Sequence, residues 1–147
     1  MRWKYSANAG FFGLRRDRFN EYQSDRSLDE KFALVSQVKG LTGIELKYPG
    51  DLDDLRKARE LLERYQLELS AVNVNTKAVE HFRHGGLSAR SADARTKTVQ
   101  LLKEGMDIAS EMGIGLVSNC PVMDGYDYPF QMDYTQAWGI SSPEYGK

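Results

Sequence analysis

The segment GIELKYPGDLDDL, residues 43–55, decides how this chain folds. Two apolar residues, Ile44 and Leu46, alternate with two charged residues, Glu45 and Lys47. This period of two is typical of a β-strand whose two faces meet different surroundings. A Tyr-Pro-Gly turn follows, and the acidic residues after it suit the first turn of a helix. The segment therefore predicts one strand-to-helix unit with an apolar and a charged face on its strand.

Strands and helices alternate in the same way along the rest of the chain. Ser27 and Glu30 form a capping box that predicts the start of the first helix, and Gly40 ends it. Ser91 is expected to cap the third helix and Gly113 to end it. The inward residues of this helix are expected to be Val99, Leu102, Met106 and Ala109. A fourth helix is expected to begin near Met132. The pattern predicts strands at 3–9, 43–47, 67–75 and 114–120, and helices at about 28–39, 51 or 53–65 and 92–112.

This order calls for parallel strands joined by right-handed helical crossovers. An open doubly wound sheet and a (β/α)8 barrel both satisfy it. The first strand leads into SANAGFFG, residues 6–13, which has no glycine-rich phosphate motif, so the barrel is favoured. We expect an α/β fold made of parallel βα units of a TIM barrel, with about four strands, which is a half or truncated barrel.

Composition restricts the classes of partner. The chain has 147 residues, a net charge of −1 and a pI of about 6.1, so a nucleic-acid partner is not expected. No apolar run approaches the roughly 18 residues of a membrane span, and no secretory signal is visible. The single cysteine, Cys120, excludes an internal disulfide and is expected to be a buried apolar residue. These features favour a soluble, cytoplasmic protein.

Alternation along each strand assigns side chains to the two faces of the sheet. Leu116 and Cys120 are expected to face the helices with Ile44 and Leu46, and Val117 to face the barrel lumen. Amides and a carboxylate near the ends of the strands suit a ligand with several hydroxyl groups. Two interpretations remain open, a structural polar network and direct ligand binding. The residues expected in the lumen are Asn8, Glu45, Lys47, Asn73, Asn75 and Asn119.

Four stretches carry a resemblance to a known family: GIELKYP (43–49), LSAVNVN (69–75), FRHGGLSARSADAR (82–95) and PVMDGYDYPFQMDY (121–134). They resemble the sugar phosphate isomerases and epimerases with the xylose-isomerase-like TIM barrel. Such relatives are barrels of roughly twice this length. The resemblance implies interconversion of ketose and aldose, or of epimers, by proton or hydride transfer. It also implies a divalent metal (Mn, Mg, Co or Zn) held by Glu, Asp, His and Glu on later strands.

By this resemblance residues 1–147 form one domain, the N-terminal half of such a barrel, with an atypical tail at 139–147. The metal ligands of the family have no positions here, so the chain alone is expected to bind no metal, and its catalytic residues are unknown. The expected ligand is a sugar or a sugar phosphate. The residues expected to bind it are Asn8, Phe12, Glu45, Tyr48, Asn73, Asn75, His84, Asn119 and Asp124.

The loop residues in this set have simpler alternatives. His84 suits a solvated loop as well as a substrate contact, and Asp124 with Gly125 is also an ordinary turn signal. Phe12 suits packing as well as an apolar wall. A second functional class is a non-catalytic half-barrel that assembles with itself or with a complementary half-barrel, because four parallel strands leave two open edges.

Overall fold

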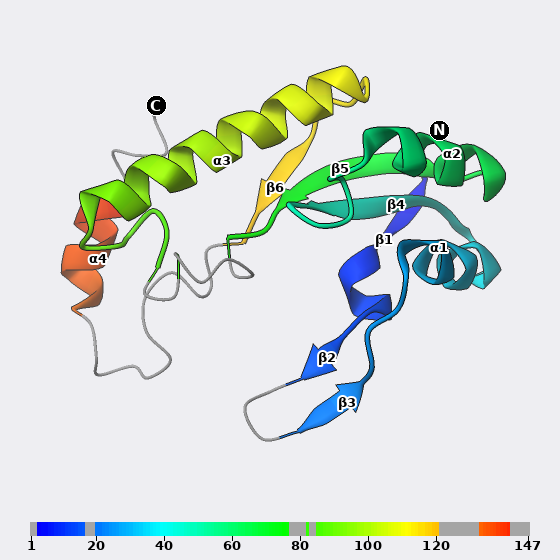
Figure 1. Cartoon of the computed structure of the whole chain (residues 1–147), viewed down its shortest axis with the longest axis horizontal. Helices are drawn as coiled ribbons and strands as arrows, with labels where there is room; N and C mark the ends of the chain where they lie inside the picture. Colours follow the sequence, from blue (N-terminus) through cyan, green and yellow to red (C-terminus); the bar gives the residue numbers. More distant parts are fainter. Residues whose placement is uncertain (1–2, 17–19, 77–81, 83–84, 121–132, 142–147) are drawn as a thin grey trace.

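The computed structural model describes residues 3–16, 20–76, 82, 85–120 and 133–141 (Figure 1). Within these residues, none of the helices combines the length and apolar character that a membrane crossing requires. The elements, with η1 a 3-10 helix, are β1 (Tyr5–Asn8), η1 (Ala9–Phe12), β2 (Arg15–Arg16), β3 (Glu21–Gln23), α1 (Leu28–Gln37), β4 (Leu41–Tyr48), α2 (Leu55–Arg64), β5 (Glu68–Val74), α3 (Ala92–Glu111), β6 (Val117–Asn119) and α4 (Tyr134–Ser141).

The four main strands form one parallel sheet in the order β1-β4-β5-β6. The sheet curls as a half-barrel, with β4 and β5 at its centre and β1 and β6 at its edges (Figure 1). Helices α1, α2 and α3 pack against one face of this sheet. We call the opposite face the lumen face. The predicted α/β half-barrel of parallel βα units is confirmed.

The core lies between the sheet and the three helices. Ile44 and Leu46 are fully buried there, together with Val72 and Val74 of β5. The helices contribute residues such as Phe32 of α1 to the same cluster. The predicted assignment of faces is therefore confirmed for the two central strands.

The caps of α1 and α3 are also confirmed. The Ser27 side chain accepts a hydrogen bond from the Glu30 amide, and the Glu30 carboxylate accepts one from the Ser27 amide. Gly113 ends α3 with φ of +73°, a backbone conformation that suits glycine. Helix α2 begins later than expected, because Asp54 is its N-cap.

Helix α3 packs on the sheet through a stripe that matches the predicted one only in part. Ala109 is buried and Leu102 packs against the core, as expected. Val99, Leu102, Met106 and Ala109 were the expected inward residues, but Met106 is 56% exposed. The buried residues of α3 are Ala94, Thr98, Gly105 and Ala109. A Cβ atom on Gly105 would lie only 2.4 Å from Val74 Cγ2, so the helix approaches β5 at its glycine. Close backbone approach therefore places small residues of α3 nearest to β5 and leaves Met106 exposed.

The prediction for the faces of the last strand is wrong. Pairing begins at Val117, opposite Val72, so Val117 takes the helix side and packs against the core. Leu116 is 56% exposed, and Cys120, expected to be buried, is exposed. A strand that begins to pair one residue later presents the opposite set of side chains to each face.

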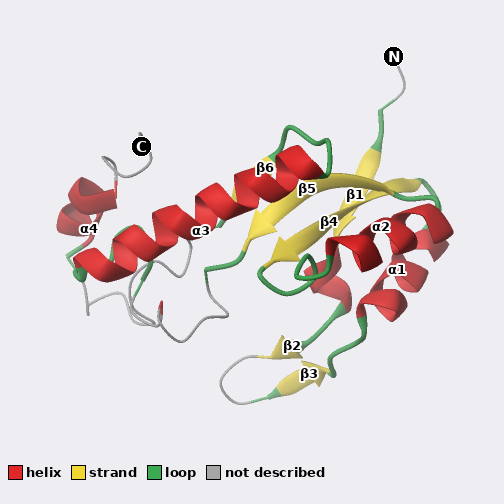
Figure 2. Cartoon of the chain, turned by 45° about the horizontal axis from the view of Figure 1, so that its top comes forward, coloured by secondary structure: helices red, strands yellow, loops and turns green. Residues whose placement is uncertain are grey.

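The connection between β1 and α1 contains a short antiparallel hairpin that the sequence pattern did not predict. Strands β2 and β3 form a second, two-stranded sheet that projects beyond the ends of β1 and β4 (Figure 2). The Gln23 side chain donates hydrogen bonds to the Gly13 and Phe11 carbonyl groups. The Asp25 carboxylate accepts one from the Leu14 amide. Hydrogen bonds between residues at the end of β3 and the segment before β2 therefore hold the hairpin in place.

Candidate functional site

Four polar side chains meet on the lumen face, each from a different strand. Glu45 Oε1 accepts hydrogen bonds from Asn8 Nδ2 and Asn73 Nδ2, each at 2.7 Å, and from Ser118 Oγ at 3.4 Å. Asn73 Nδ2 also donates to Ser118 Oγ at 3.1 Å. We call Asn8, Glu45, Asn73 and Ser118 the lumen cluster. The structure thus brings together three of the predicted site residues, Asn8, Glu45 and Asn73.

Strand register explains why these residues converge. Asn8 lies opposite Glu45, and Asn73 lies opposite Ser118. Opposite residues of neighbouring strands project from the same face of the sheet. Ser118 was missed because the wrong face was assigned to β6. The sequence pattern carries no signal for it, because the serine is placed beside Asn73 by the pairing of Val117 with Val72.

The lumen cluster fixes one oxygen of the Glu45 carboxylate and leaves the other one available. All three donors bind Oε1, and Oε2 has no hydrogen-bond partner in the described part of the chain. Oε2 is also not among the buried unpaired atoms of that part, so it reaches solvent. A carboxylate that is oriented by three donors and keeps a free oxygen is a prepared acceptor for a ligand hydroxyl group.

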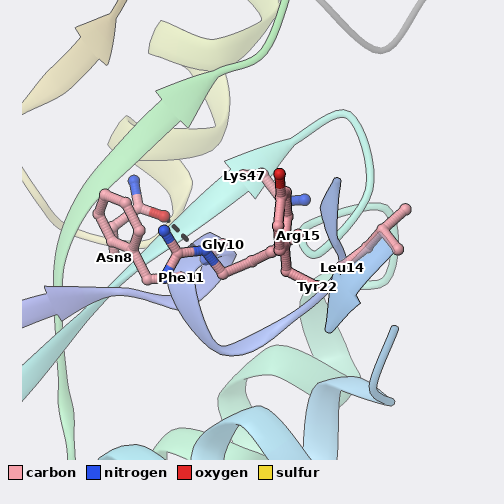
Figure 3. A pocket seen from close by; sticks show the side chains of 7 residues that line it. All are labelled: Asn8, Gly10, Phe11, Leu14, Arg15, Tyr22 and Lys47. Carbon is pink, nitrogen blue, oxygen red and sulfur yellow. Dashed lines mark hydrogen bonds between the residues drawn. The ribbon is translucent and has the colours of Figure 1, made fainter. Parts of the chain in front are cut away.

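A cleft of about 610 Å³ opens beside the lumen cluster, between the hairpin and the end of β4 (Figure 3). Lys47 lies on β4 two residues after Glu45, and its side chain lines the cleft. The Arg15 guanidinium carbon stands 5.9 Å from the centre of the Phe11 ring, which is a cation–π distance. The lining residues are Asn8, Gly10, Phe11, Leu14, Arg15, Tyr22 and Lys47.

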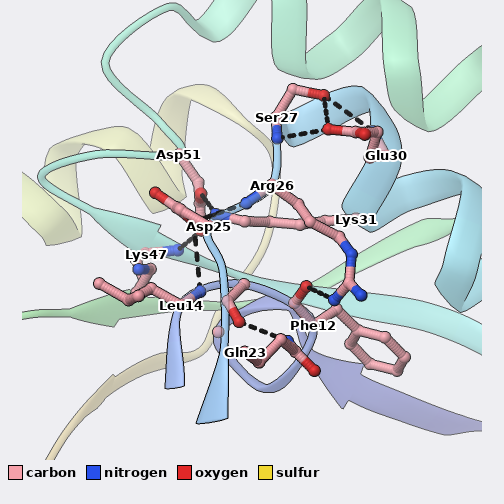
Figure 4. A network of polar contacts seen from close by, with 12 residues as sticks. Phe12, Leu14, Gln23, Asp25, Arg26, Ser27, Glu30, Lys31, Lys47 and Asp51 are labelled. Carbon is pink, nitrogen blue, oxygen red and sulfur yellow. Dashed lines mark hydrogen bonds and ion pairs between the residues drawn. The ribbon is translucent and has the colours of Figure 1, made fainter. Parts of the chain in front are cut away.

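A buried ion pair fixes the wall of this cleft (Figure 4). Lys31 Nζ lies 3.1 Å from Asp51 Oδ1, and both side chains are less than 10% exposed, at 7% and 6%. Asp51 Oδ2 accepts a hydrogen bond from the Lys47 amide at 3.2 Å. Lys31 also lies 4.0 Å from Asp25 at the base of the hairpin. Helix α1 thus ties the hairpin and the end of β4 together.

The environment of Asp25 strengthens this connection. The hydrogen bond from the Arg26 amide is the largest of the effects that lower the pKa of the Asp25 carboxyl group. Burial, the second-largest effect, opposes it, and the Leu14 amide, Lys31 and Lys47 add smaller lowering effects. The carboxylate is therefore charged at neutral pH and holds the Leu14 amide at 3.2 Å. The base of the hairpin remains bound across the physiological pH range.

At its other end the lumen face carries a different polar arrangement. Lys4 Nζ lies 2.7 Å from both carboxylate oxygens of Glu68. Gly43 of β4 lies between Ser6 and Ser70, because a Cβ atom at residue 43 would lie 3.1 Å and 3.6 Å from their Cβ atoms. The missing side chain leaves room for contacts between β1 and β5 across β4.

The remaining nominated residues lie apart from the lumen cluster. The Tyr48 hydroxyl group donates to Glu104 of α3 at 2.9 Å, and burial, followed by this hydrogen bond, raises the pKa of Tyr48. Asn119 lies opposite Val74, on the helix side, and its amide donates to the Val74 carbonyl group at 2.8 Å. Register therefore excludes Asn119 from the lumen face.

Two nominated residues lie at the edges of the site. Phe12 packs against the core, and its neighbour Phe11 lines the cleft instead. The backbone amide of Asn75, just beyond the end of β5, donates to the Tyr48 carbonyl group at 2.7 Å. His84 and Asp124 lie outside the residues that the structure describes.

A metal requires several ligand atoms that converge, but Asn8 and Asn73 turn their Nδ2 groups, not their carbonyl oxygens, toward Glu45 Oε1. The lumen cluster holds one carboxylate with two amides and a hydroxyl group. Within the described ranges, no three His, Cys, Asp or Glu side chains gather as a metal site would require. The residues of the lumen cluster therefore do not fit a divalent metal.

No family model matches the chain, and no curated protein matches it significantly. The case for a function therefore rests on the geometry of the lumen cluster and the cleft.

Proposed function

We propose that the lumen face binds a small polyhydroxylated molecule, a sugar or a sugar phosphate, and that the chain is a half-barrel of the sugar isomerase and epimerase type. The observation that carries the proposal is the free Oε2 of Glu45, on a carboxylate whose Oε1 is already held by three donors. A sugar hydroxyl group would donate to this oxygen. The ammonium group of Lys47, which lines the adjoining cleft, would donate to an oxygen of the same ligand.

The chemistry of this type interconverts ketose and aldose, or epimers, by proton transfer at a sugar carbon. The structure's own contribution would be to orient the sugar between Glu45 and Lys47. In the relatives that the sequence resembles, a divalent metal polarises the sugar oxygens. Because the lumen cluster does not fit such a metal, no step of this proposal passes through one.

Ligand binding by the Glu45→Gln variant tests the proposal. Glutamine keeps a carbonyl oxygen for the Asn8 and Asn73 donors but removes the charge. We expect sugars to bind the wild-type chain and to bind this variant about tenfold more weakly, as measured by saturation-transfer NMR titration with a panel of ketoses, aldoses and polyols. The matched control is Glu68→Gln, since Glu68 is paired with Lys4 at the far end of the sheet. Equal binding by the two variants would overturn the proposal.

A second candidate function is assembly with a second copy or with a complementary half-barrel. The sheet has two edge strands, β1 and β6, with no further strand paired to them among the described residues. Tyr5 on β1 and the adjacent Trp3 are 62% and 76% exposed. An open edge with exposed aromatic residues is a surface on which another strand can pair.

Sedimentation velocity tests this assembly. We expect a concentration-dependent dimer that Tyr5→Lys weakens, because an edge lysine opposes strand pairing. Tyr134→Lys serves as the control, since Tyr134 is also exposed, at 55%, but lies on α4. Two results together would exclude this function: the chain sediments as a monomer at all concentrations, and it forms no complex when mixed with a complementary half-barrel.

A further inference from the structure

We infer that the cleft beside the hairpin binds an anionic group, so that the ligand of the lumen face is a sugar with a phosphate or a carboxylate rather than a neutral sugar. This inference rests on the proposed function for the identity of the sugar part. The anion site itself rests on the charges, the position and the floor of the cleft.

The charges that line the cleft are both positive. Among the described residues, Lys47 and Arg15 line it, and no aspartate or glutamate does. In the described part of the chain, the Lys47 ammonium group has no hydrogen-bond or ion-pair partner, and Arg15 contacts only the Phe11 ring through its charge. Outside the lining, Asp51 pairs with Lys31, and Asp25 binds two backbone amides and is attracted by Lys31 and, more weakly, by Lys47. The described residues that line the cleft therefore supply no negative charge of their own to balance these two cations.

The position of Lys47 connects this charge to the lumen cluster. Lys47 follows Glu45 by two residues on β4, so both side chains project from the lumen face, about 6.6 Å apart along the strand. Lys47 also lies opposite Asn73, a member of the lumen cluster. A ligand whose hydroxyl group reaches Glu45 Oε2 would thus extend its charged end toward Lys47 and Arg15.

The floor and walls of the cleft keep this path open. A Cβ atom on Gly10 would lie 2.9 Å from Asn8 Oδ1 and 3.8 Å from Lys47 Cδ, so the absence of a side chain leaves space for the lysine stem. Phe11 and Tyr22 line the cleft and are 66% and 68% exposed. Their uncovered rings would contact the carbon skeleton of a sugar held between the two charges.

Titration with three ligands tests the inference and separates the two anion sources: fructose 6-phosphate, gluconate and fructose. We expect the wild-type chain to bind at least one of the two anions at least tenfold more tightly than fructose, with an affinity that falls as salt is added. The anion that binds at least tenfold more tightly than fructose shows whether the cleft accepts a phosphate or a carboxylate. Equal affinity for all three ligands would overturn the inference.

Charge-removing variants locate the site. Lys47→Met and Arg15→Met should each remove most of the gain for the anionic sugar. Arg15→Met, which removes no contact assigned to the neutral sugar, should change fructose binding less than twofold. Lys39→Met and Arg56→Met are the matched controls, because both residues are exposed and lie outside the cleft. An equal loss in the cleft variants and in these controls would contradict the assignment.

Inorganic phosphate separates this inference from the proposed function. Phosphate binding that Lys47→Met abolishes and Glu45→Gln leaves unchanged supports the anion site even if no sugar binds, and the proposed function then fails alone. Neutral sugars that bind through Glu45, with no advantage for any anion, would uphold the proposed function and overturn the anion site.

Discussion

Asn73 donates a hydrogen bond of 2.7 Å to Glu45 across 28 residues of sequence, and so joins the two central strands on the lumen face. This contact predicts the behaviour of Asn73→Asp, which would place a second carboxylate beside Glu45 and remove the donor. We expect the variant to lose about 1–3 kcal/mol of unfolding free energy at pH 8. Urea unfolding of wild type and variant at pH 8 measures the difference.

The double variant Glu45→Gln with Asn73→Asp is the control for this experiment. It exchanges donor and acceptor between the same two positions and leaves one charge, as in the wild type. We expect most of the lost free energy of unfolding to return. A double variant that is no more stable than Asn73→Asp alone would show that the contact does not stabilise the sheet.

Gly105 provides a second prediction, because its hydrogen atom faces Val74 where any Cβ atom would clash at 2.4 Å. Gly105→Ala should force α3 away from β5 and lower the free energy of unfolding by about 1–3 kcal/mol, despite the better helix propensity of alanine. Gly139→Ala in α4 is the matched control, since no atom lies within 4 Å of the added Cβ. That change should leave stability unchanged or raise it by up to about 1 kcal/mol. Thermal unfolding of both variants checks the sign.

The buried pair of Lys31 and Asp51 leads to a third prediction. Lys31→Met leaves the Asp51 carboxylate, only 6% exposed, without its partner, and should lower the free energy of unfolding by about 3 kcal/mol. Adding Asp51→Asn removes the buried charge and keeps an oxygen for the Lys47 amide. The double variant should therefore recover much of the stability. A double-mutant cycle by urea unfolding gives the coupling free energy between Lys31 and Asp51. The control Lys39→Met, at an exposed residue, should change the free energy of unfolding little.

The cap of α1 makes stability depend on pH in the acid range. The hydrogen bond from the Ser27 hydroxyl group, and after it the one from the Ser27 amide, lower the pKa of Glu30 below its ordinary value of 4.5. A pKa that folding lowers contributes stability above the unfolded value, and this contribution is lost as pH falls through the folded value. Wild type should thus exceed Glu30→Gln in stability at neutral pH, and the difference should vanish at more acidic pH. The control is Glu60→Gln, at an exposed residue of α2. The difference between its urea midpoint and that of wild type should not change in this way as pH falls.

Much of this fold follows from local patterns, and the parts that do not are set by contacts between distant residues. The alternation of Ile44 with Glu45 predicted both faces of β4, because a central strand buries one of them completely. The capping box of Ser27 likewise needs only residues three positions apart. The register of β6 depends on where pairing with β5 begins, and three residues of strand carry too little alternation to fix it.

The candidate site was predicted in the same uneven way. The sequence nominated Asn8, Glu45 and Asn73, since each follows from its strand's own period. It missed the contribution of Ser118, which requires the register of β6, and the role of the hairpin in forming the cleft. The hairpin is held by the Gln23 side chain and by the Asp25 carboxylate acting on backbone groups, which leaves no apolar periodicity to detect.

The glycine at position 43 has a consequence for what this sheet can accept opposite it. TIM barrels usually fill their interior with layers of bulky branched side chains. Here Gly43 contributes no such side chain. Ser6 and Ser70 lie on either side of it, and the ion pair of Lys4 with Glu68 lies at the same end of the sheet. Any molecule or strand that closes over this end of the sheet must bring hydrogen-bonding groups and water rather than hydrocarbon. The half-barrel is thus built to hold a wet interior.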